Sequence, residues 1–489
     1  MRRLLAMLLV LLAGAGIARA ETPPAGSPAP LVQKQLPNGL VVLRSGTDSP
    51  RAAVCVLIAT GAGSGGASGA AVDPEAWGRA ALRTASGFAD EVARRGGRVH
   101  AAADPERVEF CLELPRSEAA QGVRWLAGWL RHLATAAPTR LDAPPSNPDE
   151  LGMAKLRALA LRQHEASLAP EAAGEWERYG RETITASRSV VVLTGSVPEQ
   201  AEDLLRSELS GLARGVPRQT PTRSPQRQTS ERFMTVRDDR LAAPVVWYGW
   251  EVPGAGDSAY RALQLIGLAL AGHAEATLPR VLMQIRQVTK SVAVGLDDRA
   301  GSNLFWLRLG VTPGLQADRL AEPLGEILRR VRLLGLTERE MERAQQIVRW
   351  DFEQLFADPG ALALALGRTQ LRTGDANTLL REPQAYAAIT RLQTRDAAAL
   401  LHEQRQNIVE LHPRYYIDQP SVSERTEAKP TPRSHTVRRG DTLGEIAERY
   451  GVALDALLRA NRLQRTSLIS PGQKLVVPPL PRAPAGGQP

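Results

Sequence analysis

Residues 435–479 read HTVRRGDTLGEIAERYGVALDALLRANRLQRTSLISPGQKLVVPP, and this stretch alone predicts a complete small domain. A strand at 436–437 leads into a tight turn at 439–442, whose Asp or Thr side chain is placed to cap a helix. The apolar face of that helix has helical spacing and comprises Leu443, Ile446 and Ala447. A second helix and a closing strand at 474–477 complete a βααβ unit.

The order of small and polar residues in this unit resembles the LysM domain. The matching positions are 440–443, 446–447, Asn461, Ile469 and 471–475. LysM domains bind glycans that contain N-acetylglucosamine, in bacteria the peptidoglycan strands, in a shallow groove between two loops. The resemblance implies that these loops supply the glycan-binding residues Gly440, Asp441, Thr442, Leu443, Leu468, Ile469 and Pro471.

The first twenty residues are typical of a secretory signal peptide. Arg2 and Arg3 precede an apolar core at 4–17, and Ala18-Arg19-Ala20 fits an A-x-A cleavage site. The apolar core is too short for a comfortable membrane span, and no later apolar run is long enough for one. We therefore expect cleavage after Ala20 and a periplasmic or secreted bacterial protein without a membrane span.

The composition indicates a folded protein with an anionic partner. The chain has 489 residues, 43% of them hydrophobic, which is enough for two or three domains. Its formal net charge of +9 favours polyanions. Because an exported protein does not meet nucleic acid, we expect envelope polymers as partners and no nucleic-acid binding.

The two cysteines, Cys55 and Cys111, fall within predicted strands. In an oxidising compartment they can form one disulfide. They can equally be two small buried residues, since a bond across two strands needs a specific geometry. The sequence leaves both alternatives open.

The rest of the chain divides at segments that are poor in apolar residues. We expect a flexible segment at 21–30, repeated halves at 31–225 and 226–415, a linker at 416–433, the small domain at 434–479 and a disordered tail at 480–489. The expected fold class is α+β. Each half would place helices on one face of a mostly antiparallel sheet.

Periodicity and capping signals locate the elements of the two halves. Strands are expected at 40–44, 52–60, 107–114, 190–194, 245–252, 291–296, 304–311 and 408–411. Helices are expected from 73 onward and at 119–136, 149–164, 199–212, 258–270 and 321–334, and a capping box at 337–340 opens a further helix.

This order of elements resembles the insulinase-type peptidases, the M16 or LuxS/MPP-like metallohydrolases. The matching pieces are LPNGL at 36–40, GG at 96–97, VVVLTGSVP at 190–198, the segment 279–286 and LTEREMERA at 336–344. Active members of this family bind zinc through His-x-x-Glu-His on the first long helix and through a distant Glu. Two His residues four positions apart share one helical face and bind the metal, while the Glu polarises a water molecule.

The zinc motif is replaced in this chain. With Gly78 aligned on the family's glycine, Ala81, Thr84 and Ala85 occupy the His, Glu and His positions. We therefore expect no catalytic residue, no metal site and no cofactor, although active relatives use zinc. The seven histidines do not rebuild the site, because no two lie at ligand spacing on one element. His100, where the family has Asn, is expected to be a polar residue at the edge of the cleft.

The family's second substrate-binding element, an Arg and a Tyr that hold the peptide, is also altered. Arg286 matches the Arg, whereas the Tyr expected near 290–292 is missing. The resemblance leaves Arg286 as the candidate for a residual peptide clamp.

These features favour an exported, peptidoglycan-binding and non-catalytic insulinase-like pseudopeptidase. It would act as a wall-tethered scaffold, or as the zinc-free partner of an active M16 subunit or of another envelope protein. The alternative is an active metallopeptidase or cell-wall hydrolase with an unrecognised site, which the LysM domain would target to peptidoglycan.

Overall fold

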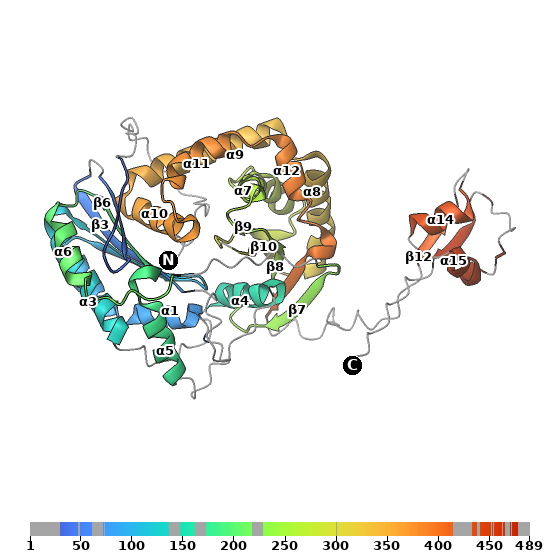
Figure 1. The fold of residues 1–489 in the computed structure, drawn as a ribbon. Coiled ribbons are helices and arrows are strands. Elements are labelled where there is room, and N and C mark those ends of the chain that lie inside the picture. The colour runs from blue at the N-terminus through green and yellow to red at the C-terminus, as the bar shows by residue number, and fades with distance from the viewer. Residues whose placement is uncertain are drawn as a thin grey trace. The chain divides into compact units, whose positions relative to one another are not determined.

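The chain forms two compact units, Met1–Ile417 and Asp418–Pro489 (Figure 1). The computed structural model describes residues 30–46, 49–60, 72, 74–135, 147–161, 173–217, 228–299, 301–413, 433–437, 441–450, 452, 454–461, 463–464, 470 and 472–477. The predicted signal peptide and tail lie outside the described residues, as do most of 21–30 and 416–433. Among the described helices, none combines the length and the apolar character that crossing a membrane requires.

The large unit alternates strands and helices. Its strands are β1 (Val32–Gln35), β2 (Val41–Ser45), β3 (Arg51–Ala59), β4 (Arg98–Ala103), β5 (Arg107–Pro115), β6 (Ser189–Gly195), β7 (Arg232–Arg237), β8 (Val245–Val252), β9 (Thr289–Leu296), β10 (Asn303–Val311) and β11 (Asn407–His412). Its α-helices are α1 (Pro74–Arg83), α2 (Ser86–Arg94), α3 (Ala119–Thr135), α4 (Pro148–Leu161), α5 (Ala173–Thr183), α6 (Gln200–Leu209), α7 (Ser258–Ala271), α8 (Ala321–Leu334), α9 (Glu338–Ala357), α10 (Pro359–Thr373), α11 (Thr378–Ala387) and α12 (Arg391–Ala398).

The two sheets of the large unit repeat one topology. The first has the order β1-β2-β6-β3-β5-β4, and the second has the order β7-β11-β8-β10-β9. In each sheet one pair is parallel, β2 with β6 and β7 with β11, and the other pairs are antiparallel. Removing β1 makes the two orders equivalent strand by strand. The predicted α+β fold with two repeated halves is therefore confirmed.

Strand alternation gives the first sheet two apolar faces. Side chains such as Val54, Phe110 and Val191 point to one face, where they form a core with α1, α3, α5 and α6. Side chains such as Leu57 and Val192 point to the opposite face, where they join a second core. Both faces of this sheet thus need a cover.

The cover of the second face comes from the other half of the chain. Helix α10 lies across β3 and β6 (Figure 1). Its Leu362 and Leu366 are buried in the same apolar core as Leu57 of β3. In the opposite direction, α4 lies on β8 and β11, where Leu156 is buried beside Trp247. Each half therefore lends one helix to the sheet of the other half. The helices of each half thus lie on one face of its own sheet, as predicted, and the lent helix covers the opposite face.

Close packing at the lent helices depends on glycines. Gly152 on α4 faces the indole of Trp247, and Gly367 on α10 faces Leu57, with no room for a Cβ atom at either position. These contacts let the helix backbones approach the sheets directly.

The small unit has the predicted βααβ order. Strand β12 (Arg433–Thr436) pairs antiparallel with β13 (Lys474–Val477), and helices α14 (Leu443–Arg449) and α15 (Leu454–Asn461) lie between them in the chain. The unit has its own apolar core, which includes Ile446, Leu457 and Leu475.

Candidate functional site

Helix α1 aligns with the zinc-binding helix of active M16 peptidases, and in this chain its side chains contribute to the apolar core. Ala81 and Ala85 are 0% and 3% exposed and pack within the apolar core of the first half. Helix α1 ends at Arg83, so Thr84 and Ala85 lie in the turn before α2. The Thr84 hydroxyl donates to the carbonyl of Ala81 at 2.7 Å and accepts from the Trp129 indole at 3.1 Å. Ala81 and Ala85 do not fit a zinc ion, because their methyl side chains offer no donor atom.

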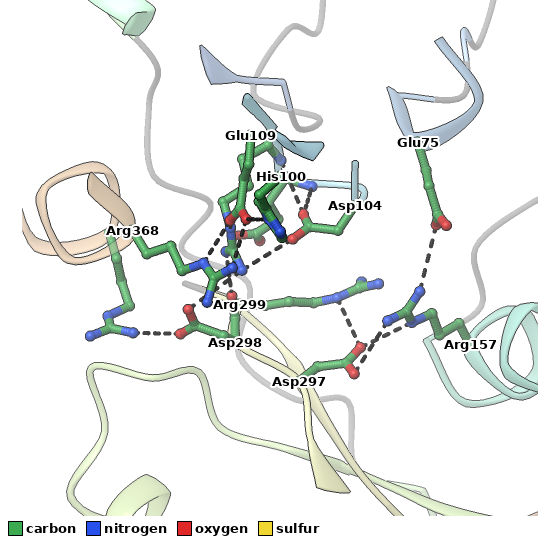
Figure 2. Close-up of polar contacts among 12 residues, drawn as sticks. Glu75, His100, Asp104, Glu109, Arg157, Asp297, Asp298, Arg299 and Arg368 are labelled. Carbon is green, nitrogen blue, oxygen red and sulfur yellow. Dashed lines mark hydrogen bonds and ion pairs between the residues drawn. The ribbon is translucent and has the colours of Figure 1, made fainter. Parts of the chain in front are cut away.

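Among the described residues, no group of three or more His, Cys, Asp or Glu side chains could hold a metal ion. The structure instead places a dense set of paired charges where the two halves meet. We call this set the ionic seam. Its members are Arg107, Glu109, Arg157, Asp297, Asp298, Arg299, Arg368 and Arg372 (Figure 2).

The first part of the ionic seam arises from the alternation of β5. Arg107 and Glu109 share the strand face that α10 covers, because residues two apart point to the same side. Arg368 of α10 donates to both carboxylate oxygens of Glu109, from Nε at 2.7 Å and from Nη2 at 2.6 Å. Arg107 Nε donates to Glu109 Oε1 at 2.8 Å. One carboxylate from the first half thus binds a guanidinium on each side (Figure 2).

The second part lies at the end of β9. Arg107 Nη1 donates to the carbonyl oxygen of Asp298 at 2.9 Å, and Arg372 of α10 pairs with the Asp298 carboxylate. Arg157 of α4 donates to both oxygens of Asp297, at 3.0 and 3.3 Å. The two lent helices therefore carry arginines that reach the same loop.

The ionic seam holds its carboxylates ionised. Burial would raise the pKa of Glu109, yet Arg368 and Arg107, with a hydrogen bond from His100, keep it well below its ordinary value. Burial opposes ionisation of Asp298 as well, and Arg372 and Arg107 lower its pKa. Burial lowers the pKa of Arg299 despite the neighbouring Asp297. Each of the three carboxylates, Glu109, Asp297 and Asp298, thus binds at least one arginine.

The space beside the ionic seam is small. A cavity of about 20 Å³ is lined by residues that include Asp298, Arg368, Arg372, Tyr260 and Tyr386. This volume holds roughly one water molecule and does not admit a peptide.

The other candidates of the large unit lie apart from one another. His100 is on the edge strand β4, with Nε2 3.3 Å from Glu109 Oε2, and its place at the edge of a cleft stays a prediction. The side chain of Arg286 is 58% exposed and its Nη2 lies 3.8 Å from Glu326 Oε2 on α8. The role of Arg286 as a peptide clamp stays a prediction.

The two cysteines lie on adjacent strands. Cys55 of β3 is directly opposite Cys111 of β5, with their Cα atoms 4.0 Å apart, and the structure joins the two sulfur atoms. Both side chains are buried on the face that α10 covers.

Three of the predicted glycan-binding residues of the small unit are described. Thr442 caps α14, because the Glu445 backbone N–H donates to its hydroxyl at 3.3 Å and the Thr442 N–H donates to the Glu445 carboxylate at 3.1 Å. Leu443 is buried in the core, and the Asp441 carboxylate is 2.8 Å from His435 Nε2. Gly440, Leu468, Ile469 and Pro471 lie outside the described residues.

Asn461 explains a further match to the LysM pattern. Its side-chain amide donates to the carbonyl of Val476 at 2.6 Å, and its oxygen accepts from the Val476 N–H at 2.6 Å. The Asn461 side chain thus makes the same pair of hydrogen bonds with β13 that the backbone of an adjacent strand would make, and it connects the end of α15 to the sheet.

Sequence reasoning missed the ionic seam altogether. One signal was present: Glu109 and Glu113 interrupt the apolar strand RVEFCLEL, and a strand buried on both faces tolerates carboxylates only with partners. The partners themselves stand too far along the chain for any local pattern to reveal.

Comparisons with known proteins agree with both units. Residues 178–348 match the family model described as the peptidase M16 inactive domain, and residues 435–478 match the LysM domain. Over 45 residues the chain is 53% identical to the probable autolysin SsaALP of Staphylococcus aureus (strain NCTC 8325 / PS 47). This match covers 9% of the chain and only 17% of the autolysin.

Solved structures resemble the large unit. A protease from Helicobacter pylori aligns with a TM-score of 0.63 and 16% identity, over 79% of this chain and 100% of that one. The peptidase M16 inactive domain from Pseudomonas fluorescens aligns with a TM-score of 0.63 and 14% identity, over 78% and 98%. At these identities the likeness shows the fold. The chain thus combines a peptidase M16 inactive domain with a C-terminal LysM domain, and its large unit has the fold of M16-like peptidases.

Proposed function

We propose that this chain is an exported protein that binds peptidoglycan through its LysM domain and holds a non-catalytic M16-like unit at the cell wall. There it acts as a scaffold or as the zinc-free partner of an active M16 peptidase. The single observation that carries the non-catalytic assignment is the burial of Ala81 and Ala85 in the apolar core. Methyl side chains at the two His positions offer no donor atom to hold a zinc ion, so helix α1 supplies no zinc-bound water to attack a peptide.

The ionic seam supports the same assignment. An enzyme that cleaves a peptide between two halves needs an accessible space and groups that are free to act on the substrate. In the seam the carboxylates of Glu109, Asp297 and Asp298 already bind arginines. Carboxylates and arginines that are paired with each other connect the two halves and are not free to act on a substrate.

The wall assignment rests on the small unit. A LysM domain implies peptidoglycan binding, and the segment shared with a named autolysin of Staphylococcus aureus is in keeping with a protein of the cell wall. The proposal of export rests on residues 1–20, whose pattern is typical of a secretory signal peptide.

The test is a sedimentation assay with purified sacculi, using the full chain and a truncation that ends at Gln419. We expect the full chain to sediment with sacculi and the truncation to stay in solution. The assay at about 0.5 M salt separates glycan recognition from charge attraction, because salt at that level screens surface charges beyond a few ångströms. Soluble N-acetylglucosamine oligomers should compete with the sacculi.

Two results would overturn parts of this proposal. Equal sedimentation of the truncation would move wall binding to the M16-like unit. Stoichiometric zinc in the purified chain, together with release of peptide or muropeptide fragments, would support the alternative of an active metallopeptidase or wall hydrolase.

A further inference from the structure

The LysM domain contains a buried histidine that joins three of its elements. His435 lies on β12 opposite Leu475 of β13, and it is 6% exposed. Its Nε2 is 2.8 Å from Asp441 Oδ2, in the turn before α14, and its Nδ1 is 3.1 Å from the Tyr450 hydroxyl at the end of α14. The rings of His435 and Tyr450 meet edge to face at 5.6 Å. A single imidazole therefore links the sheet to both ends of the helix.

The direction of the Asp441 side chain is the informative detail. The sequence allowed Asp441 or Thr442 to cap α14, and the structure gives the cap to Thr442. The Asp441 side chain is 9% exposed and turns inward to His435. A carboxylate in this orientation presents little surface to a sugar, although it immediately precedes Thr442 and Leu443 in the predicted glycan-binding loop.

We propose that His435 and Asp441 are positioning residues for glycan binding: their buried contact fixes Asp441 and, through the backbone, the adjoining Thr442, which is a predicted glycan-binding residue. This inference rests on the proposed glycan-binding function and adds to it a cause for the position of Thr442. A short loop loses conformational freedom when it binds a ligand, and a bond that orders the loop beforehand removes part of that cost. The pair acts through the backbone of Thr442 and does not touch the sugar.

Both ring nitrogens of His435 have a hydrogen-bond partner. When only Nε2 carries a proton, it donates to Asp441, and Nδ1 accepts from the Tyr450 hydroxyl. Among the described residues, Tyr450 just after α14 and Asp441 just before it are the titratable groups within hydrogen-bond distance of the ring, and Leu475 of β13 is its partner across the sheet.

A double-mutant cycle in the full chain tests the proposal. The variants are His435→Leu, Asp441→Leu and the double variant, and the readout is the affinity for a hexamer of N-acetylglucosamine measured by calorimetry. Loss of a buried charge-assisted hydrogen bond should weaken binding by about tenfold or more in each single variant. Because each residue acts through the other, the double variant should bind no more weakly than the weaker single variant.

Conservative variants separate positioning from loss of folding. His435→Gln keeps an N–H at a similar reach and should bind within about threefold of the unchanged chain, and Asp441→Asn keeps an acceptor and should do the same. His412→Leu removes a comparable His–carboxylate pair, 2.7 Å from Glu410 in the large unit, and should leave glycan affinity unchanged. Thermal unfolding of each variant verifies that the small unit is folded at the assay temperature.

The outcomes are distinct. Additive losses in the double variant, or full affinity in His435→Leu, overturn the positioning role while glycan binding stands. If Asp441→Asn weakens binding as strongly as Asp441→Leu, the carboxylate contacts the sugar and the assignment is wrong. If the unchanged chain does not bind the hexamer or sacculi, the proposed function and this inference fail together.

Discussion

Glu109 and Arg368 form a bidentate ion pair although 259 positions separate them in the chain. The side chains are 3% and 6% exposed, and the pair connects a strand of the first sheet to a helix supplied by the second half. This pair therefore joins the first half of the large unit directly to the second half.

Removing one partner of this pair should destabilise the large unit strongly. Glu109→Ala leaves Arg368 buried without its carboxylate, and we expect the free energy of unfolding in urea to fall by about 3–5 kcal/mol. The double variant Glu109→Leu with Arg368→Met should lose less than either single change, because no charge remains uncompensated. Arg381→Ala is the control: its pair with Asp375 is largely exposed and should cost less than about 1 kcal/mol. A loss below that level in Glu109→Ala would show that the seam does not hold the halves.

Acid should weaken the large unit through the same carboxylates. The pKa values of Glu109 and Asp298 are lowered in the folded chain from ordinary values of 4.5 and 3.8. The stability that they contribute is therefore fully present above those ordinary values and is lost as the pH falls toward the folded-state pKa values. Thermal unfolding between pH 7 and pH 2 should show a steep loss below about pH 4. In the double variant Glu109→Leu with Arg368→Met the slope should be smaller, and an unchanged slope would contradict the assignment.

Asp351 should stabilise the large unit as the pH falls, in contrast to Glu109 and Asp298. Burial raises the pKa of this α9 carboxyl from 3.8 to about 6. The folded chain then binds a proton more tightly than the unfolded chain, so stability increases as the pH falls from 6 to 3.8. Asp351→Asn should raise the melting temperature at pH 7, and the gain should disappear near pH 3. Glu353→Gln, an exposed position on the same helix, should change little at either pH. A melting temperature that Asp351→Asn leaves unchanged at pH 7 would count against the burial of this group.

Two glycine-to-alanine changes should have opposite signs. At Gly367 on α10 a Cβ atom would collide with Leu57 of the first sheet, and at Gly128 on α3 no atom lies within 4 Å of it. We expect Gly367→Ala to cost about 1–3 kcal/mol by overpacking. Gly128→Ala should stabilise by up to about 1 kcal/mol, because alanine favours the helix. Denaturant unfolding measures both, and a neutral Gly367→Ala would mean that α10 does not lie so close to β3.

Restoring the zinc motif by substitution should fail. The triple variant Ala81→His, Thr84→Glu and Ala85→His puts large polar groups into a buried core and into a turn after the helix end. Each overpacked position costs about 1–3 kcal/mol, so the melting temperature should drop sharply without stoichiometric zinc in metal analysis. Zinc bound at one equivalent with an unchanged melting temperature would contradict the core position of these alanines.

Local patterns predicted much of the fold for physical reasons that particular residues show. The capping box at Thr337 and Glu340 is present, and the alternation of 107–114 forms β5. Helix α10 was not predicted, because its sequence PGALALALGRTQLRT lies between two layers and lacks a polar face of the usual kind. A helix buried on most sides gives no amphipathic signal.

The candidate site was less predictable than the fold. The replacement of the zinc motif is visible at Ala81, Thr84 and Ala85 in the sequence, since residue chemistry alone decides it. The pairing of Arg157 with Asp297, in contrast, follows from the exchange of α4 and α10, which only the tertiary structure reveals. The orientation of Asp441 toward His435 is of the same kind, because sequence identifies the loop but not the direction of a side chain within it.

The exchange of α4 and α10 also sets the order in which the protein can mature. The first sheet leaves the ribosome long before α10, which covers its second face. Leu57 and Val192 therefore stay uncovered until more than 160 further residues after β6 have been synthesised. A gene cut between the halves would yield two fragments, each missing the helix that its own sheet requires. Neither should be soluble alone, and the two should recover a folded product when they are expressed together.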